Sequence, residues 1–167
     1  DGTILISADD ITTNLPYVKG VHLAFDHHSS ELVRLEDAQG SYINEADAPS
    51  AARVVYNYYG SKQEFPNVSD DLMEAVDKGD SAQFDEDEIR NPDGWALLNF
   101  LMDSRTGLGR FKTFRVSNYQ LMMELIDYCR DHSVEEILGL PDVKERVDLY
   151  LEHDGRFKEQ VQRCTTI

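Results

Sequence analysis

The chain has 167 residues, of which 41% are hydrophobic, and its 32 acidic residues against 16 basic ones give a formal net charge of -16. This length and hydrophobic content predict a globular domain with a real core and exclude an intrinsically disordered chain. The negative charge disfavours duplex DNA and membranes as partners, although a local basic island or a bound metal can still hold a phosphate.

Three further features bear on the setting of the protein. No apolar run approaches the length that spans a bilayer and no signal peptide opens the chain, so we expect a cytoplasmic protein. Cys129 and Cys164 match no metal-binding spacing, which predicts two free thiols. The chain begins at Asp1-Gly2 without Met and stops at Ile167 directly after a helical pattern, which predicts a part of a longer protein. The sequence leaves the oligomeric state open, with a homo-oligomer as one alternative.

Short β-rich segments come first. Residues 3–7, 10–15 and 21–25 are rich in strand-forming side chains, and the last of these segments is apolar nearly throughout. A strand that is apolar at successive positions is typical of a parallel sheet, in which both faces are buried. Residues 31–48 are acidic, contain Gly40 and show no clear period, so they predict a loop.

From residue 50 onward the patterns are helical. Hydroxyl side chains that cap helix N-termini and glycines that end helices mark the boundaries. These signals predict helices over residues 50–59, 70–78, 86–90 and 94–103, from residues 117 and 133 onward, and from 141 to 163. Strands in front and helices behind predict an α/β domain: a parallel sheet flanked by helices, with a helix-rich C-terminal half.

Asp26, His27 and His28 follow the third predicted strand. Neighbouring side chains of a strand point to opposite faces, so adjacent histidines serve one site only where the chain turns. Ser29 and Ser30 predict that turn. Ligands of α/β proteins bind beyond the carboxyl ends of parallel strands, and imidazole is a good ligand for Mn, Fe, Co or Zn. The spacing alone favours a metal site no more than it favours two half-exposed surface histidines.

Two other segments carry candidate site residues. Asp80 lies on a glycine-containing turn just past a predicted helix end, where its carboxylate can reach a metal, although a solvated loop acid is the more common role. Arg105 and Arg110 lie in a Gly-rich stretch without acids, and such a loop suits contacts to a substrate phosphate. The alternative is a structural turn whose arginines pair with carboxylates.

Several ordered segments resemble one known family. FDHHSSE, residues 25–31, is similar to the signature of the DHH phosphoesterase superfamily, and PSAARVVYNYYG, residues 49–60, resembles the helix that follows it. DSAQF, residues 80–84, resembles the fourth motif of the family, and residues 91–111 resemble an exopolyphosphatase-related or nanoRNase-like branch. The resemblance covers nearly the whole chain and implies a DHH-type sheet.

The resemblance also implies a hydrolase with two divalent metals at the edge of the sheet. Mn²⁺ is the usual metal, with Mg²⁺ or Co²⁺ as alternatives, and such metals bind phosphate and activate water. His27 and Asp80 would be metal ligands, with Asp77 as a second choice one helical turn earlier. His28 would contact the phosphate or protonate the leaving oxygen, and Asp26 would support both histidines.

Two departures from the family pattern stand out. The Asp-x-Asp of the first motif and the C-terminal substrate-binding domain are both absent, so residues 1–167 resemble a partial catalytic domain that we expect to be inactive alone. The bridging Asp of the second motif aligns with Asn14, whose neutral amide is a poor bridge between metals. Asp10 is the alternative, at the other end of that predicted strand.

These patterns predict that the intact protein is a metal-dependent phosphohydrolase. Its predicted substrates are short oligonucleotides, nucleoside bisphosphates or polyphosphate. The alternative is a degenerate, non-catalytic regulatory module that binds a nucleotide or a protein partner. Asn14 favours this alternative, whereas the presence of His27, His28 and Asp80 argues against it.

Overall fold

A computed structural model of the protein describes residues 5–32, 40–103, 111 and 113–165. The chain forms two compact units, Asp1–Gln83 and Phe84–Ile167. None of the described helices is long and apolar enough to cross a lipid bilayer.

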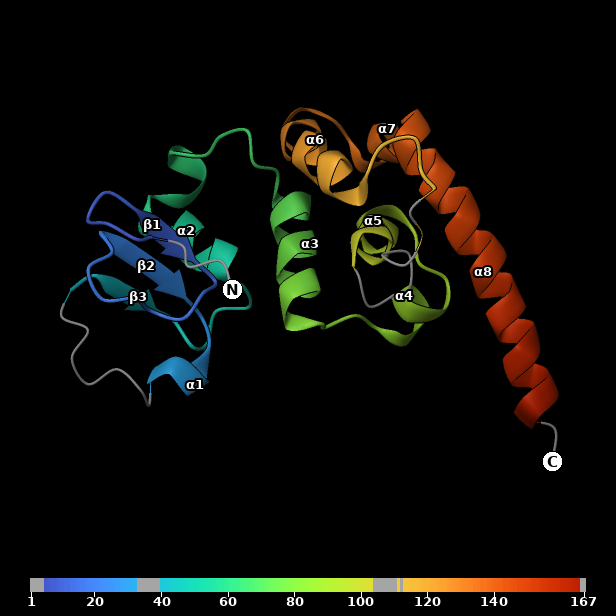
Figure 1. The fold of residues 1–167 in the computed structure, drawn as a ribbon, viewed down its shortest axis with the longest axis horizontal. Helices are drawn as coiled ribbons and strands as arrows, with labels where there is room; N and C mark the ends of the chain where they lie inside the picture. Colours follow the sequence, from blue (N-terminus) through green and yellow to red (C-terminus); the bar gives the residue numbers. More distant parts are fainter. Residues whose placement is uncertain (1–4, 33–39, 104–110, 112, 166–167) are drawn as a thin grey trace. The chain divides into compact units, whose positions relative to one another are not determined.

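The first unit contains a three-stranded parallel sheet in the order β1-β2-β3 (Figure 1). The strands are β1 at Ile11–Thr13, β2 at Leu23–Asp26 and β3 at Tyr42–Asn44. Asp26 pairs with Asn44 in the register of β2 and β3. This sheet confirms the α/β class, while the DHH-type arrangement stays a prediction.

The strand predictions were right in part. The segments 10–15 and 21–25 contain β1 and most of β2, whereas the described residues 5–7 of the first predicted strand have no regular structure. The prediction of a loop over 31–48 was wrong, because β3 lies within it. A three-residue strand is too short for an alternating pattern to stand out, and it forms by pairing with β2.

The first unit also contains helices. They are α1 at Ser29–Leu32, α2 at Ala51–Tyr58, the short 3-10 helix η1 at Ser61–Gln63, and α3 at Asp70–Ser81. Of these, α2 packs against β2 and α3 packs against α2. Phe25 of β2 and Val54 of α2 are fully buried in the core between sheet and helix. Helix α3 runs past the predicted end at residue 78 and stops at Ala82, whose φ of 55° is left-handed. Asp80 therefore lies in the last turn of a helix rather than on a loop.

Buried polar contacts tie the start of α2 to α3. Ser50 caps α2 by accepting a hydrogen bond from the backbone N–H of Arg53, and its hydroxyl donates to Oδ1 of Asp77 at 2.6 Å. Arg53 donates to Oδ2 of Asp77 through Nε at 2.9 Å and Nη2 at 2.5 Å. Both oxygens of Asp77 are thus used to hold the two helices together.

The described elements of the second unit are helical, as predicted for the C-terminal half. They are α4 at Glu86–Arg90, α5 at Gly94–Met102, α6 at Asn118–Asp131, α7 at Val134–Leu138 and α8 at Pro141–Thr165. The buried core side chains are Leu97, Leu98, Leu101, Leu121, Leu125, Ile137 and Val143. Cys129 and Cys164 are both free thiols, as their spacing predicted.

One charged side chain is fully enclosed in this second unit. Arg146 of α8 is 0% exposed. Its guanidinium donates to the side-chain oxygen of Asn118 at 2.9 Å and to the backbone carbonyls of Asp142 and Val116, each at 2.8 Å. The guanidinium also lies 4.0 Å from the centre of the Phe114 ring. Arg146 therefore holds the segment before α6 against α8.

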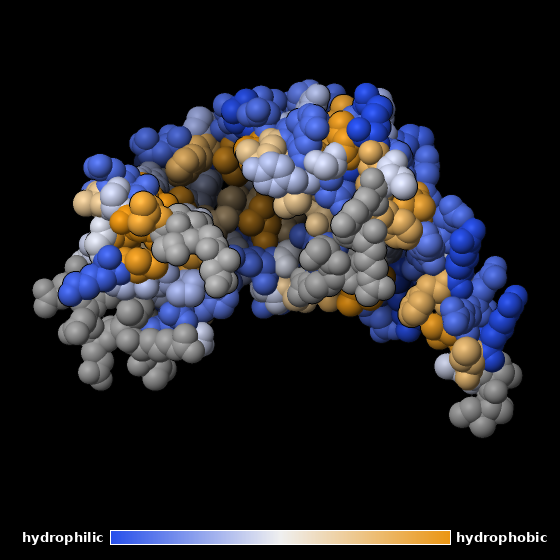
Figure 2. Space-filling view, in the orientation of Figure 1, coloured by the Kyte–Doolittle hydropathy of each residue, from blue (hydrophilic) through white to orange (hydrophobic). Residues whose placement is uncertain are grey.

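The C-terminal part of α8 contributes little to the core. Figure 2 shows hydrophobic side chains among hydrophilic ones there, and Leu151, Phe157 and Val161 are exposed. Every residue from Gly155 to Thr165 is exposed. The packing of α8 thus depends on its first half, where Val143 and Arg146 are buried.

Candidate functional site

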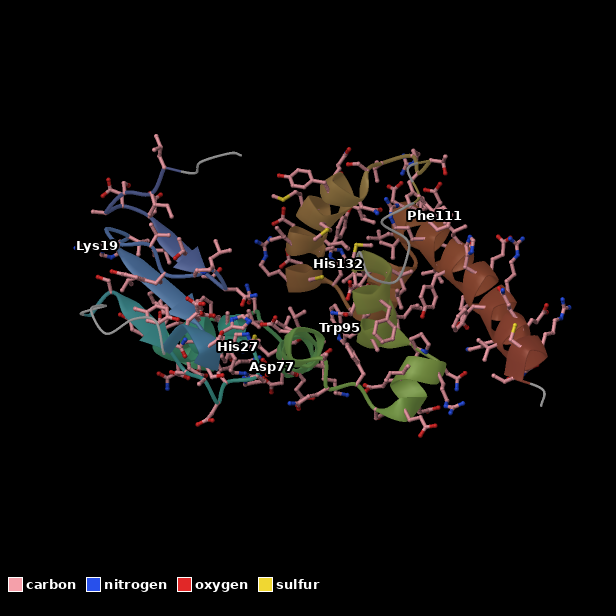
Figure 3. All side chains as sticks on the ribbon, turned by 60° about the horizontal axis from the view of Figure 1, so that its bottom comes forward. Lys19, His27, Asp77, Trp95, Phe111 and His132 are labelled. Atoms are coloured by element: carbon pink, nitrogen blue, oxygen red, sulfur yellow. The ribbon has the colours of Figure 1, made fainter. Side chains whose placement is uncertain are left out.

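The site begins where β2 ends. The chain leaves the strand at Asp26 and turns through His27 and His28 before α1 starts at Ser29, so the two rings leave the strand in one place. Their centres are 4.6 Å apart. Figure 3 shows His27 at the carboxyl end of β2, next to the helix α3 that carries Asp77.

The two ring nitrogens of His27 have different surroundings. Nδ1 lies 3.1 Å from the carbonyl oxygen of Ala48, which can only accept, so Nδ1 carries the proton of the neutral ring. Nε2 then holds a lone pair, and it lies 3.1 Å from Oδ2 of Asp80. These two atoms do not meet at a hydrogen-bonding angle, so Nε2 is a buried atom without a hydrogen-bond partner in the described part of the chain.

This arrangement fits a divalent cation. Nε2 of His27 lies 3.1 Å from a carboxylate oxygen of Asp80 without a hydrogen bond to it, and the His27 side chain is only 12% exposed. Buried polar atoms in proteins nearly always have a bonding partner, so an atom without one indicates that a water or an ion binds there. An imidazole nitrogen and a carboxylate oxygen are common ligands of transition metals, and a backbone carbonyl on the other ring nitrogen is the usual support.

Asp80 is held in place from two sides. It comes from the last turn of α3, and its Oδ2 accepts from the backbone N–H of Ala51 at 3.3 Å, at the start of α2. Its side chain is 30% exposed, so it borders solvent. Asp77, the second choice from the sequence, points its oxygens to Ser50 and Arg53 instead. The structure thus brings Asp80, and not Asp77, to His27.

Asp26 organises the turn from a buried position. Its side chain is 1% exposed. Oδ1 accepts from the backbone N–H of His27 at 2.8 Å and lies 2.7 Å from Nδ1 of His28, while Oδ2 accepts from the hydroxyl of Tyr42 at 3.0 Å. Burial acts to raise the pKa of Asp26, but the hydrogen bonds from His28, Tyr42 and the backbone together hold it below its usual value. The carboxyl group is therefore ionised.

His28 is the exposed member of the pair, with 53% of its side chain accessible. The hydrogen bond to Asp26 raises the pKa of His28; partial burial opposes this rise, and the charges of Asp26, Asp80 and Glu31 add to it. With Nδ1 donating to Asp26, Nε2–H is left to face a ligand. His28 is thus arranged to donate a hydrogen bond or a proton.

Tyr42 and Asn44 were missed by the sequence analysis because β3 was predicted as a loop. The amide of Asn44 donates to the Tyr42 hydroxyl at 2.7 Å and to the carbonyl oxygen of His28 at 3.1 Å. Residues two apart on a strand share one face, so recognising β3 would have placed both side chains on the same face. Tyr42 thus binds Asp26, which in turn accepts from the His28 ring, and Asn44 binds both Tyr42 and the backbone of His28.

Asn14 lies at the same edge of the sheet as His27, whereas Asp10 lies at the opposite edge. Asn14 follows β1 at the carboxyl end of the sheet, is exposed, and donates its backbone N–H to Phe25 at 2.9 Å. Asp10 precedes β1 at the opposite end, where its carboxylate accepts from the backbone N–H and hydroxyl of Ser7. Those hydrogen bonds lower the pKa of Asp10. Arg105 and Arg110 fall outside the described residues.

The described residues that meet here do not by themselves form a metal site. Among them, no three His, Cys, Asp or Glu side chains converge on one point. His27 and Asp80 are the pair that the structure does bring together. A complete coordination sphere therefore needs further ligands, such as water, substrate oxygens or other protein groups.

Comparison with solved structures finds a similar protein of known activity. The chain is similar to the pGpG-specific phosphodiesterase PggH from Vibrio cholerae, with 54% sequence identity and a TM-score of 0.84. The match covers 98% of this chain and 52% of that protein, so the chain spans about half of its length. No family model and no curated protein matches the chain.

Proposed function

We propose that the intact protein is a metal-dependent phosphodiesterase that cleaves short oligonucleotides such as pGpG. The observation that carries the proposal is the buried Nε2 of His27, which faces Asp80 without a hydrogen bond. The similarity to PggH supports a dinucleotide over nucleoside bisphosphates and polyphosphate, which were also predicted from the sequence.

In this proposal His27 and Asp80 hold a divalent cation, with Mn²⁺ as the first choice. When bound, such a cation stabilises charge on the phosphate and activates water. The carbonyl of Ala48 fixes the tautomer and orientation of His27, and the N–H of Ala51 orients Asp80. The residues thus present one nitrogen and one oxygen ligand from preformed positions.

His28 has a separate role beside this pair. Asp26 accepts from Nδ1 of His28 and stabilises the protonated ring. The exposed Nε2–H donates to a phosphate oxygen or protonates the leaving oxygen as the bond breaks. Asp26 does not touch the substrate and acts as a positioning residue for His28.

The proposal is tested by assaying the full-length protein with pGpG before and after removal of metal by a chelator. We expect hydrolysis that is lost on chelation and restored by Mn²⁺, and saturable binding of Mn²⁺ to the metal-free protein. If the protein showed neither Mn²⁺-dependent hydrolysis nor tight binding of Mn²⁺, the proposal would be wrong. That outcome would instead support the non-catalytic binding module.

The Tyr42 hydroxyl provides a test of the support for His28. We expect Tyr42→Phe to lower kcat toward pGpG by about two- to tenfold, because one hydrogen bond to ionised Asp26 is lost. KM should stay the same, since Tyr42 reaches the reaction through Asp26 and His28. Steady-state kinetics separate the two constants.

Tyr17→Phe is the matched control for Tyr42→Phe. The Tyr17 ring packs on that of Tyr42 with centres 5.5 Å apart, while its hydroxyl forms no hydrogen bond within the described part of the chain. This variant should keep the kcat of the unmodified protein. If both variants lost activity to the same extent, packing rather than the hydrogen bond would explain the loss.

A further inference from the structure

A polar pocket adjoins the candidate site in the first unit. Its volume is about 590 Å³, and it is lined by residues 44–49, which connect β3 to α2, and by Arg53 and Asn57 of α2. This volume lies within the usual range for sites that bind small molecules. None of the roles assigned to His27, His28 or Asp80 uses this pocket.

The pocket shares residues with the site itself. Ala48 lines the pocket, and its carbonyl oxygen accepts from Nδ1 of His27. Asn44 also lines the pocket, and its amide donates to the carbonyl oxygen of His28. A ligand that fills the pocket therefore lies against Ala48, which orients the His27 ring, and against Asn44, which binds the backbone of His28.

Hydrogen-bond acceptors line one part of the pocket. Glu45 and Asp47 are exposed, and neither carboxylate forms a hydrogen bond or an ion pair with any described residue. The turn that carries them is closed by a hydrogen bond from the N–H of Ala48 to the carbonyl oxygen of Glu45 at 2.9 Å. The pocket thus offers two free carboxylates on an ordered turn.

Hydrogen-bond donors come from α2. Arg53 uses Nε and Nη2 to bind Asp77, which holds its guanidinium in place and leaves Nη1 available. The side-chain oxygen of Asn57 accepts from the Ser61 hydroxyl at 3.4 Å, so the NH₂ group of the amide stays available as a donor. Acceptors and donors therefore line the same pocket on different elements.

The carboxylates and the donors of the pocket together favour some parts of a nucleotide over others. Two carboxylates repel a phosphate, so the phosphate of a nucleotide is directed to the histidines and away from the pocket. Guanine offers N1–H and N2–H₂ as neighbouring donors, and O6 and N7 as acceptors. Adenine has an amino group in place of O6, lacks the 2-amino group and has an acceptor at N1. The donor edge of guanine matches the carboxylates, and that of adenine does not.

We propose that this pocket binds a guanine base of the substrate. A carboxylate of Glu45 or Asp47 accepts from N1–H and N2–H, while Arg53 and Asn57 donate to O6 and N7. The proposal rests on the proposed function for the phosphate site and adds the basis of base specificity. It makes Glu45 and Asp47 specificity-determining residues.

The test compares pGpG with pApA in the full-length protein. The unmodified protein should prefer pGpG in kcat/KM by about tenfold or more, and the double variant Glu45→Gln, Asp47→Asn should lose most of that preference by raising KM for pGpG more than for pApA. Glu74→Gln is the matched control, since Glu74 is an exposed acid on α3 outside the pocket. It should keep the full preference.

Three outcomes would overturn the proposal: equal use of both dinucleotides by the unmodified protein, a preference that survives the double variant, or an equal loss for both dinucleotides. Loss of Mn²⁺ binding in the double variant with an intact preference would identify the pocket as a cation site instead. Measuring the equilibrium binding of pGpG and pApA under conditions without hydrolysis tests the base pocket separately from the proposed phosphodiesterase activity. A binding preference for pGpG that depends on Glu45 and Asp47 in a protein without phosphodiesterase activity would leave the base pocket standing and refute the proposed function.

Discussion

His27→Gln is expected to lower the rate of pGpG hydrolysis by the intact protein about a thousandfold, because a metal that stabilises phosphate charge is worth several kcal/mol. Glutamine keeps a polar side chain but removes the imidazole nitrogen that faces Asp80. Asp80→Asn should have an effect of the same size, since an amide is a weaker ligand than a carboxylate. The two losses should not add in the double variant, because both residues serve one site.

Binding of Mn²⁺ gives a readout that does not depend on catalysis. Titration of the metal-free protein should show that His27→Gln lowers the affinity for Mn²⁺ by about a hundredfold or more. Even the loss of a residue that only supports a metal ligand lowers metal affinity by about 10- to 100-fold. His22→Gln is the matched control, because His22 is exposed and precedes β2, at the end of the strand away from His27. A folded His27→Gln protein with normal Mn²⁺ affinity and activity would contradict the assignment.

Arg146→Met should lower the free energy of unfolding of the second unit by about 3 kcal/mol or more. Methionine keeps much of the volume of the arginine stem. It leaves the side-chain oxygen of Asn118 and the carbonyls of Asp142 and Val116 without the donors that they have now. Buried acceptors without donors lose the solvation that they have in the unfolded chain, which is the source of the loss.

The single tryptophan, Trp95, packs against the core of the second unit and provides the probe for this measurement. Urea denaturation followed by its fluorescence reports on that unit. Arg115→Met is the control, because the Arg115 side chain is largely exposed and its ion pair with Asp142 should contribute less than about 1 kcal/mol. If both variants lost the same free energy of unfolding, the buried contacts of Arg146 would contribute no more to stability than the exposed ion pair of Arg115.

Local signals account for the parts of the fold that sequence reasoning predicted. Ser69, Ser117 and Ser133 each accept a backbone hydrogen bond at the start of a helix, as their positions before the predicted helices indicated. Such caps act within one helical turn, so they are visible in a short stretch of sequence. The helical C-terminal half was therefore predictable in detail.

Contacts between distant residues were harder to predict. β3 is stabilised by pairing with β2, and Asp80 remains helical because α3 continues through Gly79. The pairing of His27 with Asp80 was suggested by the family resemblance, since their spacing in the chain carries no periodic signal. Arg146 sits in a strongly charged helix, where no pattern distinguishes a buried arginine from an exposed one. These features depend on packing, which a local pattern does not contain.

The hydrogen bond from His27 to Ala48 has a consequence for how this site tolerates change. The acceptor is a backbone carbonyl, so no substitution of the Ala48 side chain removes it. The position of that carbonyl depends instead on the number of residues between β3 and the cap of α2, and on the turn closed from Ala48 to Glu45. Inserting or deleting one residue there would shift the carbonyl away from the ring. The length of this connection, more than the identity of residue 48, is what the orientation of His27 requires.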